Sequence, residues 1–221
     1  SYVGTFVAQY YGAGEHQRIG AVMWQGLYVA LMGGVLIASL IPFAGIFFSF
    51  VGHEPVIRDH ETVYFRILCL GAIPAITTAA LSGFFSGRGR TWPVMWADLA
   101  ATGVNVILDY ILIFGKFGLP ELGIAGAAIA TVISGVVASS ILFTLMAVPM
   151  RNRVFAVSTG WRFDPALFRR LMRFGLPSGV QFMLDVAGFA IFLLLLGRLG
   201  TASLAATNIA FNINTLAFMP M

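Results

Sequence analysis

Long stretches without a charged residue constrain the fold of this chain more than any other feature of its sequence. Four of them, at 21–51, 67–87, 122–150 and 199–221, exceed the roughly 20 residues that a helix needs to cross a lipid hydrocarbon core of about 30 Å. Two further segments, 91–115 and 174–197, are equally apolar apart from isolated acids. The sequence therefore predicts several membrane-spanning segments.

These segments are predicted to be helices, because they are too long and too continuously apolar for barrel strands. In lipid, a helix satisfies its backbone hydrogen bonds internally. The composition agrees: 59% of the residues are hydrophobic and 10% charged, against about 45–50% and about 25% in soluble domains. We expect an all-α integral membrane protein, a polytopic helical bundle that crosses the cell membrane of a bacterium several times, with the lipid bilayer as a partner.

The formal net charge of +4 does not indicate nucleic-acid binding, because the basic residues sort by connection between the spans. Nine arginines lie in alternate connections: Arg18, Arg88, Arg90, Arg151, Arg153, Arg162, Arg169, Arg170 and Arg173. The other set of connections contains four basic residues, Arg58, Arg66, Lys116 and Arg198, whose charge is offset by nearby acids. Under the positive-inside rule, the arginine-rich connections are cytoplasmic.

The longest polar stretch, 151–173, divides the chain. We expect it to be a cytoplasmic linker between an amino-terminal lobe, 1–150, and the start of a carboxy-terminal lobe, 174–221, with a helix starting at Asp164-Pro165. Between the predicted span 21–51 and the next one, we expect an outer loop that ends at residue 61. Both ends of the chain fall inside apolar sequence, so we expect an incomplete bundle, a fragment of a longer protein. Cys69 is the only cysteine, so the chain has no disulfide and no cysteine-based metal site.

Polar residues inside one predicted span form a stripe. Asp98, Thr102, Asn105 and Asp109 are separated by four, three and four residues, which places them within roughly 60° of one helix face. A carboxylate at the bilayer centre costs about 2.5–3.5 kcal/mol on insertion scales and is functional by default. Burial disfavours the charged form of a carboxylate, which suits a group that exchanges a proton or binds a cation. The alternative is that such acids lock helices together, or, for Asp98, that the acid lies at the membrane interface.

Other spans contain weaker polar stripes. The candidates for lining a substrate cavity are Gln25, Tyr28, Met32, Gln181, Asn208 and Asn212. For Gln25, Tyr28 and Met32, packing in the core or against lipid is the competing interpretation. Small residues repeat every four positions at Gly126, Ala130, Ser134 and Ala138, a spacing that predicts close helix contacts. Walker A, His-Glu-x-x-His and Gly-x-Ser-x-Gly motifs are absent from the sequence, so we expect neither an enzyme nor a bound cofactor.

Four stretches, in order along the chain, resemble the multidrug and toxic compound extrusion (MATE) family. They are FVAQYYGAG at 6–14, NVILDYILIFG at 105–115, LGIAGAAIATVIS at 122–134 and RFGLP at 173–177. They resemble the loop after the second helix, the fifth helix, the start of the sixth and the opening of the seventh. The resemblance implies a chain that runs from the end of helix 2 to the middle of helix 8 of a twelve-helix, two-lobed transporter.

The resemblance also implies a function, namely secondary active antiport that exports cationic or amphipathic compounds in exchange for Na⁺ or H⁺. Asn105 and Asp109 match the polar cluster of the family's amino-terminal lobe, and are the candidate Na⁺ ligands. Asp185 matches the acidic position of helix 7. Asp185 and Thr131, which falls in helix 6, are the further candidates for ion coupling. A lipid-linked oligosaccharide flippase of the same superfamily is the alternative, although a more cationic cavity is expected there. A non-transporting membrane subunit would leave the acidic stripe unexplained.

Overall fold

The computed structural model describes residues 2–51, 55–148, 153–198, 207 and 209–214, and within these ranges it contains helices and no strand. Five segments are long and apolar enough to cross a membrane. The predicted all-α fold of a multi-pass membrane protein is therefore confirmed. The elements are α1 (Tyr2–Gly12), α2 (Arg18–Ala38), the 3-10 turn η1 (Ile41–Phe43), α3 (Ala44–Val51), α4 (Pro55–Ser86), α5 (Trp92–Ile113), α6 (Gly123–Ala147) and α8 (Pro165–Arg198).

The chain forms two compact units, Ser1–Leu171 and Met172–Met221. The division falls inside the stretch 151–173 that was predicted to be a linker. Most of that stretch belongs to the first unit. The second unit contains the greater part of α8 and a short helical piece at 209–214.

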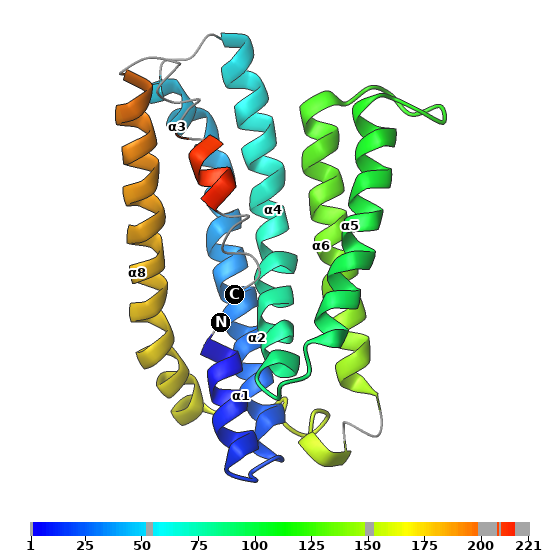
Figure 1. Cartoon of the computed structure of the whole chain (residues 1–221), viewed down its shortest axis with the longest axis vertical. Coiled ribbons are helices and arrows are strands. Elements are labelled where there is room, and N and C mark those ends of the chain that lie inside the picture. The colour runs from blue at the N-terminus through cyan, green and yellow to red at the C-terminus, as the bar shows by residue number, and fades with distance from the viewer. Residues whose placement is uncertain (1, 52–54, 149–152, 199–206, 208, 215–221) are drawn as a thin grey trace. The chain divides into compact units, whose positions relative to one another are not determined.

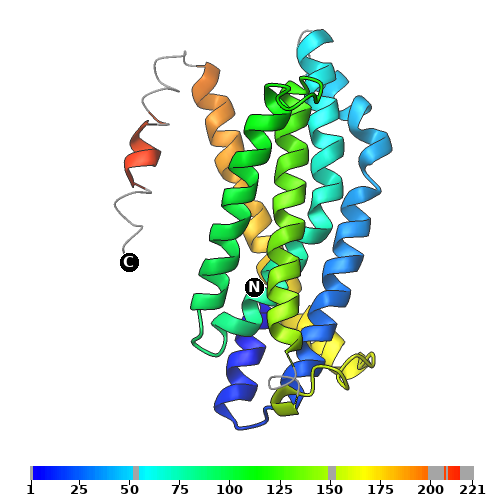
Figure 2. The same cartoon turned by 90° about the vertical axis from the view of Figure 1, so that its right-hand side faces the viewer.

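Helix α4 lies between α2 and α6 in the first unit, while α5 packs against α6 and α1 packs across α2 and α4 (Figures 1 and 2). A Cβ at Gly126 of α6 would lie 2.7 Å from the carbonyl carbon and oxygen of Leu112 in α5. Only a glycine allows these two backbones to approach so closely. Ala130 and Ala138, on the same stripe, are buried. The small-residue spacing therefore marks a helix contact, as predicted.

The arginine-rich connections gather at one end of the first unit. Figure 1 shows the α1–α2 turn, the α4–α5 turn and the segment before α8 at the bottom of the view, and the α5–α6 loop at the top. The α4–α5 turn is tight because Gly89 takes a φ of 71°, a left-handed conformation that glycine adopts without steric cost. We call the bottom end the Arg-rich end.

Helix α4 begins earlier than the sequence suggested. The loop predicted to run up to residue 61 is wrong from Pro55 onward, because Asp59 and His60 lie in the first two turns of α4. A helix of 32 residues is about 48 Å long and exceeds the hydrocarbon thickness. Its polar first turns can therefore lie outside the lipid, where water solvates their side chains. The loop residues His53 and Glu54 fall outside the described residues.

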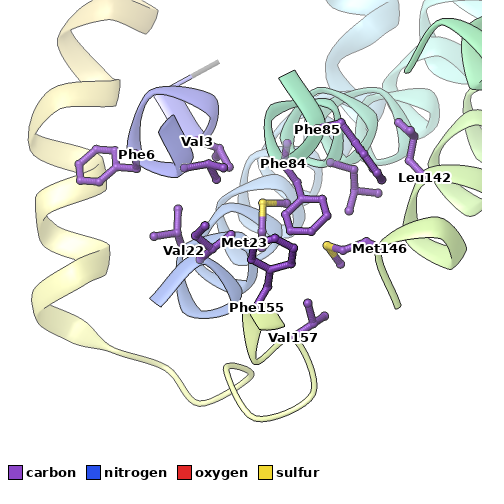
Figure 3. Packing of buried hydrophobic residues seen from close by; sticks show 14 of the residues in the cluster. Val3, Phe6, Val22, Met23, Phe84, Phe85, Leu142, Met146, Phe155 and Val157 are labelled. Carbon is purple, nitrogen blue, oxygen red and sulfur yellow. The ribbon is translucent and has the colours of Figure 1, made fainter. Parts of the chain in front are cut away.

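The buried core of the first unit lies toward the Arg-rich end. Figure 3 shows Met23, Phe84, Met146 and Phe155 converging there from α2, α4, α6 and the segment that follows α6. Away from this core, large apolar side chains are exposed on the helices, such as Leu36, which is 70% exposed. Exposed apolar surface of this extent is expected where helices face lipid.

The start of α8 agrees with the prediction of a helix at Asp164-Pro165. The Asp164 carboxylate Oδ1 accepts hydrogen bonds from the backbone N–H groups of Ala166 and Leu167, both at 3.0 Å. These N–H groups have no partner within the helix, so Asp164 caps its first turn.

Candidate ion-coupling site

The polar stripe of α5 is divided between two environments. Asn105 and Asp109, one turn apart, are half-buried. Asp98 and Thr102, nearer the Arg-rich end, are exposed. The four residues share a helix face, but only the pair toward the opposite end of α5 is partly enclosed by protein.

Asp109 has the one buried carboxylate oxygen that lacks a hydrogen-bond donor among the described residues. Its Oδ1 is fully enclosed, and no described group donates to it. A charged oxygen in such a place is costly unless a proton, a cation or water satisfies it. The amide oxygen of Asn105, at the preceding turn, adds a second oxygen of the kind that hard cations bind.

Two side chains of α6, Thr131 and Ser134, carry hydroxyl groups. Thr131 is exposed, and its hydroxyl donates to the Ala127 carbonyl at 2.9 Å. Ser134 donates in turn to the Thr131 carbonyl at 2.8 Å. Both hydrogens are used within α6, but the hydroxyl oxygens keep lone pairs that can accept a bond or bind a cation. Thr131 stays a predicted ligand, because no described contact joins it to Asp109.

The described residues contain no group of three or more His, Cys, Asp or Glu side chains that could hold a metal ion. The predicted ligands at Asp109 are its own carboxylate and the neutral oxygens of Asn105 and Thr131. One negative charge balances a monovalent cation or a single proton, and does not balance a divalent ion. Na⁺ or H⁺ as the coupling ion stays a prediction.

The second unit contains the other predicted acid. Gln181 and Asp185 lie one turn apart on α8 and are exposed. Phe189, a turn further along, packs edge-to-face against Phe211 with 4.8 Å between ring centroids. This contact brings the helical piece that contains exposed Asn212 alongside α8. Asn208 falls outside the described residues.

The polar residues of α2 contact the segment that precedes α8. Gln25 is fully buried, and its Nε2 donates to the Arg162 carbonyl at 3.2 Å. Tyr28 donates its hydroxyl to the Trp161 carbonyl. Met32 is 61% exposed. A role of these three residues in a substrate cavity stays a prediction, while the structure gives two of them a different contact.

Sequence reasoning missed one member of this group. This member is Trp24, whose indole N–H donates to the Val157 carbonyl at 2.7 Å. One signal was present in the sequence: Phe155 and Val157 are apolar residues inside an otherwise polar stretch, as expected of a segment that packs on the bundle.

Known proteins share this architecture. Residues 3–111 match the MatE family. A probable multidrug resistance protein NorM of Rhizobium meliloti is 32% identical over 98% of this chain, and one of Bradyrhizobium diazoefficiens is 33% identical over 98%. A solved outward-facing multidrug resistance MATE family transporter superimposes on 99% of the chain with a TM-score of 0.83 at 25% identity. The chain belongs to the MATE family.

The resemblance seen in the four sequence stretches is therefore confirmed, and the chain is a multi-pass protein of the cell membrane. This MATE chain spans about half the length of the relatives it matches, 47% of both NorM proteins and 48% of the solved transporter. The comparisons assign it to a family of transporters and not to a class of enzymes.

Proposed function

We propose that the complete protein is a secondary active antiporter that exports cationic or amphipathic compounds in exchange for inward Na⁺ or H⁺. Relatives named as multidrug resistance proteins support the efflux part of this proposal. The observation that supports ion coupling is the buried carboxylate oxygen of Asp109, which has no donor among the described residues. The proposal includes no enzymatic step and no bound cofactor.

Coupling would arise from the charge of Asp109. When Na⁺ or H⁺ occupies the site, the carboxylate is neutralised and its surroundings can close around it. When the site is empty, the charge requires water. A carboxylate inside a membrane helix costs about 2.5–3.5 kcal/mol, and about 1.4 kcal/mol changes an equilibrium tenfold. Occupancy could therefore shift the balance between two conformations by about two orders of magnitude, since a ligand acts only through its differential affinity for them.

Na⁺ and H⁺ place different demands on Asn105. A bound Na⁺ would use its amide oxygen as a ligand, whereas a proton on Asp109 would need at most one hydrogen-bond partner. The acid of the second unit, Asp185, would hold an ion of its own or attract the cationic substrate. These alternatives predict different results for the same set of variants.

The test uses the complete protein reconstituted in vesicles, with efflux of a cationic dye driven by a Na⁺ gradient or by a pH gradient imposed separately. We expect Asp109→Asn to lower gradient-driven efflux at least about 100-fold, the effect of about 2.8 kcal/mol of lost coupling, with near-normal expression. The matched control is Asp98→Asn, an exposed acid on the same face, which should keep its efflux. Full ion-coupled efflux by Asp109→Asn and Asp185→Asn alike would disprove this mechanism.

Two further variants identify the ion and the role of the second acid. Asn105→Leu should raise the Na⁺ concentration needed for half-maximal efflux at least about tenfold if Na⁺ is bound, and leave H⁺-driven efflux nearly unchanged. Asp185→Asn should abolish coupling if the second unit binds an ion. If Asp185 serves the substrate instead, the same variant should weaken binding of cationic dyes and spare that of neutral ones.

A further inference from the structure

Three side chains of α2 bind the backbone of one segment far away in the sequence. Trp24 donates to the Val157 carbonyl at 2.7 Å, Gln25 donates to the Arg162 carbonyl at 3.2 Å, and Tyr28 donates to the Trp161 carbonyl. The pairs are separated by 133–137 residues. The three donors lie within an arc of about 100° around the axis of α2, so one side of this helix binds three carbonyls of the segment.

The backbones of α2 and of this segment also touch directly. A Cβ at Gly20 would lie 2.5 Å from the carbonyl oxygens of Phe155 and Ala156. A Cβ at Gly160 would lie 2.6 Å from the backbone nitrogen of Ala21. Glycine on each side is what allows main chain to lie against main chain. The segment itself is turned by a hydrogen bond of 2.8 Å from the Gly160 N–H to the Ala156 carbonyl.

Apolar and aromatic contacts join the same segment to the core. Phe155 and Val157 are 7% and 4% exposed, and Figure 3 shows both directed into the cluster around Met23 and Phe84. The Arg88 guanidinium carbon lies 3.7 Å from the centre of the Phe84 ring and 4.6 Å from that of Phe155. A cation over two aromatic rings adds attraction at this end of the bundle.

We infer that residues 155–162, here called the strap, are a fixed closure of the Arg-rich end of the first unit, and that Trp24, Gln25 and Tyr28 are its positioning residues. The strap stays on α2 while the protein works. Hydrogen bonds, backbone contact and core burial all support this, and all lie within the first unit. The attachment of the strap to α2 does not depend on the proposed antiport, whereas its persistence during transport rests on that proposed function.

The first experiment measures how often the strap leaves α2. Trypsin is added to the Arg-rich side of membranes that contain the complete protein, and cleavage after Arg162 is followed by mass spectrometry. Trp24→Phe and Tyr28→Phe each remove one donor and keep an aromatic ring. Each should speed cleavage about fivefold, the effect of one neutral hydrogen bond, and the two together about 25-fold. Leu36→Met, an exposed residue on the same helix, is the control and should cleave at the wild-type rate.

The second experiment asks whether the strap stays in place during transport, and it needs no substitution. Cleavage after Arg162 in the natural protein is compared at rest and during gradient-driven dye efflux. We expect the two rates to agree within about twofold. A tenfold acceleration during efflux would show that the strap detaches and would overturn the inference. Equal cleavage of the double variant and the Leu36→Met control would overturn it as well, whatever the transport results.

Discussion

Asp98 and Asp109 lie on one face of α5 but in different surroundings, because the Oδ1 of Asp109 is enclosed by protein. Asp98 lies near the start of the helix, where it is exposed. A charged side chain is tolerated at such a place because water solvates it. Eleven residues further along, the Oδ1 of Asp109 is enclosed by protein and has no donor among the described residues. Position along the stripe therefore decides which acid has an enclosed oxygen, and the proposed ion site rests on this difference.

The close contact at Gly126 predicts how a substitution there changes the stability of the protein. In the complete protein, Gly126→Ala would push a methyl group against the Leu112 carbonyl and separate α5 from α6. We expect it to lower the free energy of unfolding by about 1–3 kcal/mol, a typical effect of overpacking, measured as a lower thermal midpoint in detergent. Gly103→Ala, on α5 with no atom within 4 Å of its Cβ, is the control and should not be destabilised. Equal midpoints for both variants would contradict the close contact.

Helix α8 depends for its first turn on one side chain. Asp164 accepts both N–H groups that the helix leaves unpaired there. Asp164→Ala should destabilise this turn by about 1 kcal/mol, which corresponds to roughly fivefold faster hydrogen exchange at the amides of Ala166 and Leu167. Asp164→Asn, which keeps an acceptor oxygen, should exchange almost like the wild type. Unchanged exchange in Asp164→Ala would mean that other contacts hold the turn.

Within the first unit, the connections with most arginines share one end (Figure 1), and the positive-inside rule predicts that this end is cytoplasmic. In a cysteine-free background with Cys69→Ala, Arg153→Cys should react with an impermeant maleimide only from the cytoplasm. Lys116→Cys, in the loop at the opposite end, should react only from outside. Both positions are exposed, so accessibility does not limit the reaction. The reverse labelling pattern would invert the proposed orientation.

The sequence by itself determined the membrane class, the helical fold and the approximate position of the spans. This was possible because lipid offers no hydrogen bonds, so an uncharged run of sufficient length must be a helix. Outside the lipid, water can satisfy the backbone and this constraint no longer applies. The sequence therefore predicted a start of α4 after residue 61, whereas the helix begins at Pro55. Helix periodicity also established that Asp98 and Asp109 share a face, because it depends only on the 3.6-residue turn.

Only the tertiary structure decided what each face meets. The spacing of Gln25 and Tyr28 fixed their relative direction, but the strap that they bind is more than 130 residues away. The burial of the Asp109 Oδ1 and the exposure of Asp98 likewise depend on neighbours that periodicity does not specify. A local pattern fixes angles around one helix axis, whereas contacts between distant segments arise only when the whole bundle packs.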